Sequence, residues 1–429
     1  MKILLIGSGG REHALAWKLK QSPSVTQVIC PNGNPGISLV AETPKVPLSS
    51  PLDWAEFAKQ QKIDLVVVGP EQPLAEGVTD ACLAYGIPVF GPTKTAAQLE
   101  ASKSFSKEVM NAAGIPTAQA KSFTEYAPAL DFAKSLGLPV VVKADGLAAG
   151  KGVAICTTAK ELETALSENF TEKRFGSSSS SVLVEQFLHG QEASLLALCD
   201  GTDVYLLPPS QDHKRAYDGD QGPNTGGMGT YAPAPLVTEE VLSATLSGVM
   251  LPALREMASR GTPYKGVLYA GLMISPEGEL NVLEFNCRFG DPETQVVLPL
   301  IDGDLAEAML ACAEGRLAKH LAQRNGNTLT MRPEAAACVV CASGGYPGNY
   351  QTGKVITGLE SSDPANSIVF HAGTAFDSHG NVVTAGGRVL GVTAWGPTLK
   401  DAVARAYQLT DQIHFDGMML RGDIAHRAL

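Results

Sequence analysis

The sequence predicts a multidomain protein of α/β and α+β type, and three observations carry this prediction. At ~150 residues per domain, the 429 residues would form about three domains. Over the first hundred residues, buried strands alternate with helices, which is typical of a doubly wound parallel sheet. A hairpin follows in the central region, and a mixed, β-rich pattern follows after residue 325. We therefore expect domains at residues 1–101, 102–325 and 326–429.

Composition narrows the functional class. A net charge of −11 disfavours a protein that binds nucleic acid by neutralising its phosphates. The 8 cysteines are scattered, and the one CxxC, Cys338 to Cys341, lies in an apolar run, so neither a disulfide framework nor a zinc site is expected. No run approaches the ~20 apolar residues of a membrane span, and the N-terminal apolar run is too short for a signal peptide. We expect a cytoplasmic protein with no nucleic-acid or membrane partner.

The first domain opens with an apolar strand, a glycine turn and a helix. Gly9 and Gly10 lie in that turn, which presents backbone N–H groups and a helix N-terminus to an anion. Glu12 stands where the dinucleotide-binding fingerprint requires its third glycine, which disfavours an NAD site. Glu71 follows a second buried strand, at the same edge of the expected sheet. A ligand at this edge would lie beside Gly9, Gly10 and Glu71; the alternative is a domain with a structural role only.

Two lysines of the central region stand out. Lys103 falls in the first turn of an expected helix, where its charge opposes the helix dipole, so it is either a surface lysine or part of a site. Lys143 ends an apolar strand, and a charge among apolar neighbours is costly unless it is paired, for example by a phosphate. The glycine-rich residues 146–153 follow and predict a cover over that phosphate. They are not a P-loop, because Asp145 and Gly152 break that motif.

The strand that follows the serine run ends in groups that suit a nucleotide. Glu185 and Phe187 mark a strand end that offers main-chain donors and acceptors to a flat heterocycle, and the Glu192 carboxylate can accept from a sugar hydroxyl. Further along, residues 210–215 are dense in polar side chains, and the glycine-rich residues 222–229 can bring their backbone close to a ligand. The alternative for these last two segments is a disordered surface loop.

The second strand of a hairpin around Glu277 and Gly278 carries the strongest chemical pattern. Alternation places Glu284, Asn286 and Arg288 in one row, opposite an apolar face. Mg²⁺ takes oxygen ligands, and near a nucleotide one or two come from the protein and the rest from phosphates and water. The carboxylate and the carboxamide supply such oxygens, and the guanidinium can hold an anion with two hydrogen bonds. The alternative is an edge strand with a solvated polar face.

The C-terminal region is expected to be β-rich and to end in a helix. Thr398 is the N-cap candidate of that helix. Arg388 is a polar residue of note here, although such a residue is more often part of the surface than of a site. The expected strands cover residues 335–342, 367–371, 382–384 and 388–394.

Several of these segments together resemble the glycinamide ribonucleotide synthetase family, the phosphoribosylamine–glycine ligases of the ATP-grasp superfamily. The resemblance spans nearly the whole chain, and the serine run at 177–181 is its least similar piece. The matching segments are Gly9–Ala14 (GGREHA), Gly69–Glu71 (GPE), Lys143–Gly152 (KADGLAAGKG), Gln211–Arg215 (QDHKR), Gly222–Gly229 (GPNTGGMG) and Glu284–Glu293 (EFNCRFGDPE).

The resemblance implies an ATP-grasp fold for the central domain, with a small lid subdomain at about 118–190. It also implies a reaction, in which glycine is joined to 5-phosphoribosylamine while ATP is split to ADP and phosphate. This is the second step of de novo purine synthesis, and it passes through glycyl phosphate. The cofactors would be ATP and Mg²⁺ or Mn²⁺, the partners would be small molecules only, and the chain would act as a monomer.

Roles for individual residues follow from the resemblance, with Glu284 and Asn286 as the metal ligands. The expected ATP-binding residues are Lys103, Lys143, Gly150, Lys151, Gly152, Glu185, Phe187 and Glu192. The residues expected to act in the chemistry are Lys143, Asp212, Lys214 and Arg288. The residues expected to contact the substrates are Gly9, Gly10, Arg11, Glu12, Glu71, Asn224, Gly226, Gly227, Arg288, Asp291 and Arg388.

Within these sets, our interpretation separates the two substrates. Glycine would lie near Asp212, Lys214 and Arg288, close to the glycine-rich loop at 224–229. The ribose phosphate would lie between the Gly9–Glu12 turn and Arg388.

Three other functions compete with this hypothesis. The nearest is another ATP-grasp ligase or carboxylase, which would accept a different carboxylate or amine, such as bicarbonate or formate. The second is an NAD-dependent oxidoreductase, which the residue at position 12 disfavours. The third is a regulator that binds ATP without turning it over.

Overall fold

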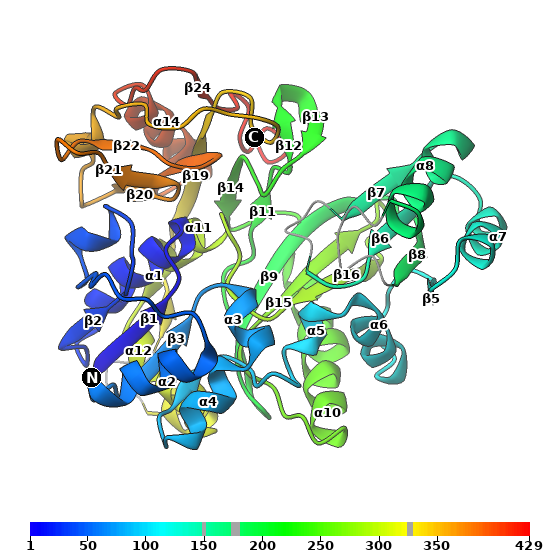
Figure 1. Ribbon diagram of the computed structural model, residues 1–429, viewed down its shortest axis with the longest axis horizontal. Helices are drawn as coiled ribbons and strands as arrows, with labels where there is room; N and C mark the ends of the chain where they lie inside the picture. Colours follow the sequence, from blue (N-terminus) through cyan, green and yellow to red (C-terminus); the bar gives the residue numbers. More distant parts are fainter. Residues whose placement is uncertain (148–151, 173–180, 324–328) are drawn as a thin grey trace.

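Four parallel strands form the sheet of the N-terminal domain, in the order β2-β1-β3-β4 (Figure 1). These strands are β1 (Lys2–Ile6), β2 (Gln27–Ile29), β3 (Leu65–Val68) and β4 (Val89–Phe90). The helices of this part are α1 (Gly10–Lys20), α2 (Pro51–Gln60), α3 (Glu71–Glu76), α4 (Val78–Ala84) and α5 (Gln98–Ala101). The strands are almost wholly apolar because helices cover both faces of a parallel sheet. The predicted doubly wound domain is thus confirmed.

The fold is seen in a computed structural model that describes residues 1–147, 152–172, 181–323 and 329–429. A small subdomain projects from it and contains an antiparallel sheet in the order β5-β8-β6-β7 (Figure 1). Its elements are β5 (Ala120–Phe123), α7 (Tyr126–Leu136), β6 (Val140–Ala144), β7 (Val153–Cys156), α8 (Ala159–Phe170) and β8 (Val182–Gln186). The preceding helix, α6 (Lys103–Ala112), buries Val109 and Met110 in the core of the main body instead. Helices α7 and α8 bury their apolar residues against this sheet in a core of its own. The subdomain can therefore hold its shape independently of the main sheet.

The central sheet is antiparallel, in the order β10-β9-β15-β16. Its strands are β9 (Gln191–Asp200), β10 (Val204–Leu206), β15 (Lys265–Ile274) and β16 (Leu280–Asn286). The accompanying helices are α9 (Glu239–Thr245), α10 (Leu251–Ser259), α11 (Thr294–Val297), α12 (Leu305–Glu314) and α13 (Leu317–Leu321). Strands β15 and β16 form the expected hairpin, with Tyr269 opposite Asn286. The polar row of β16 is thus fixed on a strand of the central sheet.

The C-terminal sheet recruits strands from two distant parts of the chain, in the order β11-β14-β19-β23-β20, with β24 paired to β19. Its strands are β11 (Gln211–Asp212), β14 (Gly229–Ala232), β19 (Ala335–Ser343), β20 (Ser367–His371), β23 (Arg388–Gly396) and β24 (Met418–Met419). Helix α14 (Leu399–Thr410) packs on it and begins, as expected, at the N-cap Thr398, whose side chain accepts from the Asp401 N–H. The polar segment at 210–215 is thereby attached to the C-terminal domain.

Short elements complete the described part of the chain. They are β12 (Arg215–Tyr217), β13 (Gln221–Asn224), β17 (Ile301–Asp302), β18 (Thr330–Met331), β21 (Thr374–Phe376), β22 (Val382–Thr384), the 3-10 turns Ile37–Leu39, Asp218–Asp220, Leu298–Leu300 and Leu359–Ser361, and the π-helical turn Leu246–Met250. None of the helices in the described ranges combines the length and the apolar character needed to cross a bilayer.

Candidate active site

A cavity of about 350 Å³ is lined by residues of all three domains. Its polar lining consists of Arg11, Glu71, Glu100, Lys103, Ser106, Lys107, Lys143, Asn286, Glu284, Arg288, Asp291 and Arg388. Its apolar lining comes mainly from α6, the small subdomain and β16, and includes Leu99, Met110, Leu147, Val153, Leu183, Leu283 and Phe285. One part of the cavity therefore combines lysines with an apolar wall, and another combines arginines with carboxylates.

The polar row of β16 faces this cavity. Glu284 and Asn286 are adjacent on it, and Asn286 Oδ1 accepts from the Arg288 guanidinium at 3.3 Å. Although burial opposes ionisation of Glu284, the charges of Lys214, Lys143 and Lys103 hold the pKa of its carboxyl below the usual value. An ionised carboxylate beside a carboxamide oxygen fits a hard divalent cation that takes its other ligands from phosphates and water. Within the described ranges, no cluster of three or more His, Cys, Asp or Glu side chains offers a closed metal site.

Lys143 lies at the end of β6 and is 7% exposed. The sequence suggested a phosphate as the partner of this charge; in the structure it forms an ion pair with Glu185. Lys107 contacts the other Glu185 oxygen at 3.0 Å, so the carboxylate is shared by two lysines. Burial opposes the charge of Lys143, but Glu185 and Glu284 raise the pKa of its ammonium. Lys143 therefore keeps its positive charge at the cavity wall.

Lys103 opens α6, and its unfavourable position in the first turn is compensated by Asp145. The Asp145 carboxylate accepts from the Lys103 N–H at 2.7 Å and from the Ser104 hydroxyl at 2.7 Å. An acidic group at a helix N-terminus stabilises the helix dipole. The Lys103 ammonium itself donates to the Gly146 carbonyl at 2.8 Å, which directs it toward the cavity.

Asp212, Lys214 and Glu192 form a second charged group that is not part of the cavity lining. Lys214 forms an ion pair with Glu192, at the start of β9. Burial, with smaller contributions from Glu293 and Glu192 and against the effect of Lys214, raises the pKa of Asp212 to about 7. Lys214 is the strongest of the charges that lower the pKa of Glu284, so this group acts electrostatically on the polar row of β16.

The turn after β1 is organised around Glu12. Its two carboxylate oxygens accept from the Gly9 N–H and from the Arg11 Nε–H, each at 2.6 Å. A Cβ atom added at Gly7 or Gly69 would collide with the Glu12 side chain, so glycine is required at both positions. Arg11 donates to the Phe289 carbonyl at 3.1 Å and lines the cavity, whereas Gly9, Gly10 and Glu12 do not.

Arg288 lies between two carboxylates. Its guanidinium is 3.3 Å from Glu71 and 3.2 Å from Glu100, and although burial opposes its charge, these two groups raise its pKa. Arg388, which comes from the C-terminal domain, is 3.3 Å from Asp291 and donates to the Gly226 carbonyl at 2.5 Å. The two arginines bring the N-terminal, central and C-terminal domains together at one end of the cavity.

Several other residues that were expected to bind ATP or the substrates do not line the cavity. Phe187 is partly buried and its ring contacts that of His189, with centroids 4.9 Å apart. Asn224 is exposed on β13, and neither it, Glu185, Phe187 nor Gly227 belongs to the cavity lining. Gly152 lines the cavity, whereas Gly150 and Lys151 lie outside the described residues.

Sequence reasoning missed Lys107 and Glu100, both in the lining. Lys107 lies four residues after Lys103 on the same helix, so helical spacing predicts that both face the same side. The Glu100 side chain is 8% exposed; it accepts from the Cys287 N–H at 2.6 Å and contacts Arg288. No local pattern distinguishes Glu100 from an ordinary helix residue, because its role depends on a partner 188 positions along the chain.

Comparison with protein families identifies this architecture. Family models described as the N domain, the ATP-grasp (A) domain and the C domain of phosphoribosylglycinamide synthetase match residues 1–100, 101–294 and 336–427. Two phosphoribosylamine–glycine ligases are similar over the full chain. The one from Synechocystis sp. is 50% identical and covers 100% of both chains, and the one from Escherichia coli K12 is 47% identical and covers 100% of this chain and 99% of its own.

Solved structures agree at the level of the fold. The crystal structure of phosphoribosylamine–glycine ligase from Thermotoga maritima has a TM-score of 0.83 and 31% identity, and covers 99% of this chain and 100% of its own. The biotin carboxylase domain of 2-oxoglutarate carboxylase from Hydrogenobacter thermophilus, solved with MgADP and bicarbonate, has a TM-score of 0.72 and 20% identity, and covers 98% of this chain and 91% of its own. The second likeness is one of fold alone.

Proposed function

Because this chain belongs to the phosphoribosylglycinamide synthetase family, whose enzymes are ATP-grasp ligases, we infer that it joins glycine to 5-phosphoribosylamine, with cleavage of ATP to ADP and phosphate. This is a step of purine synthesis. The observation that carries the inference is the common cavity in which Glu284 and Asn286 face Lys103, Lys143 and Arg288.

The proposed chemistry explains why these charges are needed. A free carboxylate is a poor acyl donor, because its leaving group would be oxide. Transfer of the γ-phosphate to glycine gives glycyl phosphate, whose leaving group is phosphate, and the amine of phosphoribosylamine then attacks the acyl carbon. The first transfer brings two anions together, so positive charge must be placed in advance. Lys103, Lys143 and Arg288 supply it from fixed positions on α6, β6 and the end of β16.

The ATP subsite is proposed to lie between α6, the small subdomain and β16. Lys103 and Lys143 would hold the phosphates, the strand end at Glu185 and Phe187 would hold adenine, and Glu192 would hold the ribose. The apolar lining from α6 and the small subdomain supports this location for a flat base. A divalent metal on Glu284 and Asn286 would neutralise charge on the phosphates, and we propose Mg²⁺ for it.

The two substrate subsites are proposed on the other side of the polar row. Glycine would lie near Asp212, Lys214 and Arg288, whose mixed charges suit an ammonium and a carboxylate. The ribose phosphate would lie between the Gly9–Glu12 turn and Arg388. The support for this second location is the placement of Arg11 and Arg388 in one cavity. We further propose that the chain works as a monomer in the cytoplasm.

The decisive experiment is an assay of phosphate release from ATP. We expect release only when glycine and phosphoribosylamine are both present. Bicarbonate or formate in place of glycine should give none; turnover with either would assign the chain to another ATP-grasp activity instead. Glu284→Gln should lower kcat about 10²-fold or more while ATP still binds weakly, because the proposed metal site loses its one anionic protein ligand. A wild-type protein that binds ATP but never turns it over would instead be a regulator.

A further inference from the structure

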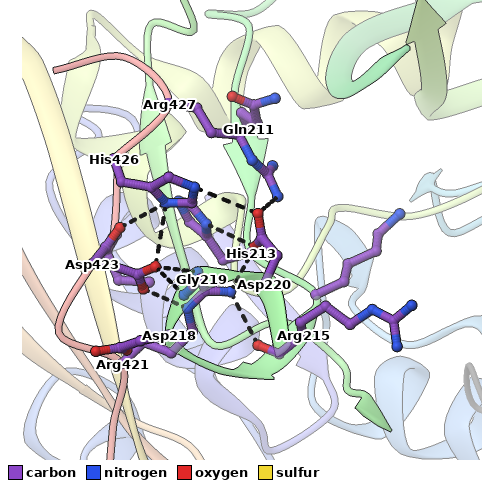
Figure 2. Close-up of polar contacts among 12 residues, drawn as sticks. Gln211, His213, Arg215, Asp218, Gly219, Asp220, Arg421, Asp423, His426 and Arg427 are labelled. Carbon is purple, nitrogen blue, oxygen red and sulfur yellow. Dashed lines mark hydrogen bonds and ion pairs between the residues drawn. The ribbon is translucent and has the colours of Figure 1, made fainter. Parts of the chain in front are cut away.

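The C-terminal segment Arg421–Arg427 lies against the loop that follows Asp212 (Figure 2). Arg421 is 0% exposed, and its guanidinium N–H groups have hydrogen-bond partners in the interior. It donates to both Asp423 oxygens at 2.7 and 2.8 Å, and to Asp220 at 2.9 Å. It also donates to the Arg215 carbonyl at 3.2 Å. A buried arginine that is paired with two carboxylates is held firmly in place, because removing these partners would leave its charge uncompensated in the interior.

The rest of this segment adds contacts to the same loop. Asp423 accepts from the Gly219 N–H at 2.8 Å, and the Gly422 N–H donates to Asp218 at 2.8 Å. Arg427 donates to the second Asp220 oxygen at 2.7 Å. Figure 2 shows the side chains of Arg421 and Arg427 directed at Asp220, and Asp423 directed at both Arg421 and Gly219. The segment and the loop are therefore joined by a network of charged hydrogen bonds, which are stronger than neutral ones.

His213 connects this network to the residues proposed to bind glycine. It is 0% exposed, and its Nε2 accepts from the Ala425 N–H at 2.9 Å. Burial, with a smaller contribution from Arg421, lowers the pKa of His213 to about 3, so the ring is neutral. Its proton is therefore on Nδ1, which lies 4.0 Å from Asp220. The backbone N–H of His213 donates to the Gly229 carbonyl at 2.9 Å, and the His213 carbonyl accepts from the Met228 N–H at 2.8 Å. Both the side chain and the backbone of His213 are held.

Ala425 is constrained in a way that supports a specific role. It is buried and has φ +70°, which places a residue with a Cβ in the left-handed region. That conformation is unfavourable for a residue other than glycine, because the Cβ atom crowds the following carbonyl oxygen. It is maintained by the surrounding contacts, including the hydrogen bond to His213.

We propose that Arg421–Arg427 is a positioning element for the glycine subsite, an inference that rests on the proposed function. Strand β11 ends at Asp212, and the backbone of His213 continues its pairing with Met228 and Gly229, so successive side chains here alternate in direction. Asp212 and Lys214 therefore point away from the His213 side chain, which Ala425 holds. The opposite direction of Lys214 is seen in its ion pair with Glu192 of β9. His213 and Arg421 thus hold the segment on the side opposite the side chains of Asp212 and Lys214, and those two side chains face the proposed glycine subsite. His213 and Arg421 are positioning residues and do not touch substrate.

A matched pair of variants at His213 tests this role. His213→Leu removes the acceptor and leaves the buried Ala425 N–H unpaired, whereas His213→Gln keeps an acceptor at a similar reach. We expect His213→Leu to raise the KM for glycine about tenfold, with the KM for ATP within about twofold of wild type. His213→Gln should restore the KM for glycine to within about threefold. His379→Leu, at an exposed histidine of the C-terminal domain, is the control.

Asp423→Asn provides a milder variant in case His213→Leu does not fold. It weakens the contact with Arg421, and we expect the KM for glycine to rise about threefold or more. The proposal is overturned if these variants lower Tm but leave the KM for glycine unchanged, or if they raise the KM of every substrate alike. If the wild-type protein shows no glycine-dependent formation of ADP, it is the proposed function that fails.

Discussion

At the scale of single residues, the site is set by how burial and neighbouring charges act on each ionisable group. Burial opposes the charge of Lys214, but Glu192 and Asp212 hold its pKa well above the usual value. Asp212 shows the opposite balance, because burial and the carboxylates of Glu293 and Glu192 outweigh Lys214 and raise its pKa to about 7. Lys214 therefore stays charged at neutral pH, and Asp212 is the group of this pair that titrates.

This difference predicts a pH dependence of glycine binding. If ionised Asp212 accepts from the ammonium of glycine, the KM for glycine should rise as the pH falls below about 7 and approach tenfold per pH unit. The carboxyl with a raised pKa is protonated on the acid side, so binding is lost in that direction. Steady-state kinetics from pH 5.5 to 8.5, a range of roughly three units around that pKa, would measure it. Asp212→Asn should abolish the dependence, while a flat profile in the wild type would contradict the role.

At the scale of elements, the contact between the small subdomain and α6 determines where Lys103 lies. Asp145 follows β6 and accepts from the first N–H of α6, while the next residue, Gly146, accepts from the Lys103 ammonium. Strand β6 and helix α6 thus place Lys143 and Lys103 together. The Asp145 carboxylate thus stabilises the N-terminus of α6 although Asp145 is not part of that helix.

Asp145→Ala should therefore weaken ATP binding as well as stability. We expect the free energy of unfolding to fall by about 1 kcal/mol, from the lost contacts at the N-terminus of α6. We also expect the Kd for ATP to rise about tenfold, because Lys103 loses its fixed direction. Denaturant titration and calorimetric binding would measure the two effects. Asp131→Ala, at an exposed carboxylate on α7, is the control, and an unchanged Kd in Asp145→Ala would contradict this account.

At the scale of the whole molecule, the N-terminal and C-terminal domains are joined through a buried polar contact. The His371 N–H donates to His13 Nδ1 at 2.8 Å, and Asn34 donates to the His371 carbonyl at 2.7 Å. Burial lowers the pKa of His13 to about 3 and that of His371 to about 4, so both rings are neutral in the folded protein. The two domains joined by this contact contribute Arg11 and Arg388 to the lining of one cavity.

The same contact predicts a loss of stability in acid. In the unfolded chain a histidine has a pKa of about 6.5, so below that pH the unfolded state binds protons that the folded state excludes. Each such histidine should cost about 1.4 kcal/mol of unfolding free energy per pH unit, down to its folded pKa. His13→Asn keeps an acceptor at the Nδ1 position without titrating, so its stability curve should be shallower by about that slope. A curve as steep as that of the wild type in His13→Asn would argue against the buried His13 as a cause of the acid sensitivity.

Much of the fold and part of the site were predictable from local pattern. The alternation in β16 placed Glu284, Asn286 and Arg288 on one face, and the same side chains line the cavity. Apolar strands and glycine turns likewise predicted the parallel sheet of the N-terminal domain. These features depend on periodicity over a few residues, which side-chain direction in strands and helices determines directly.

The sequence by itself therefore determined the domain classes, the polar row on β16 and the lysines near the end of β6 and at the start of α6. Only the tertiary structure decided which polar groups pair: Glu185 with Lys143, Asp291 with an arginine 97 residues away, and the His213 ring with the backbone N–H of a residue 212 positions away. The physical reason is that strand and helix periodicity acts over neighbouring residues, whereas the partner of a buried charge is selected by packing between domains, where any unpaired group would be costly.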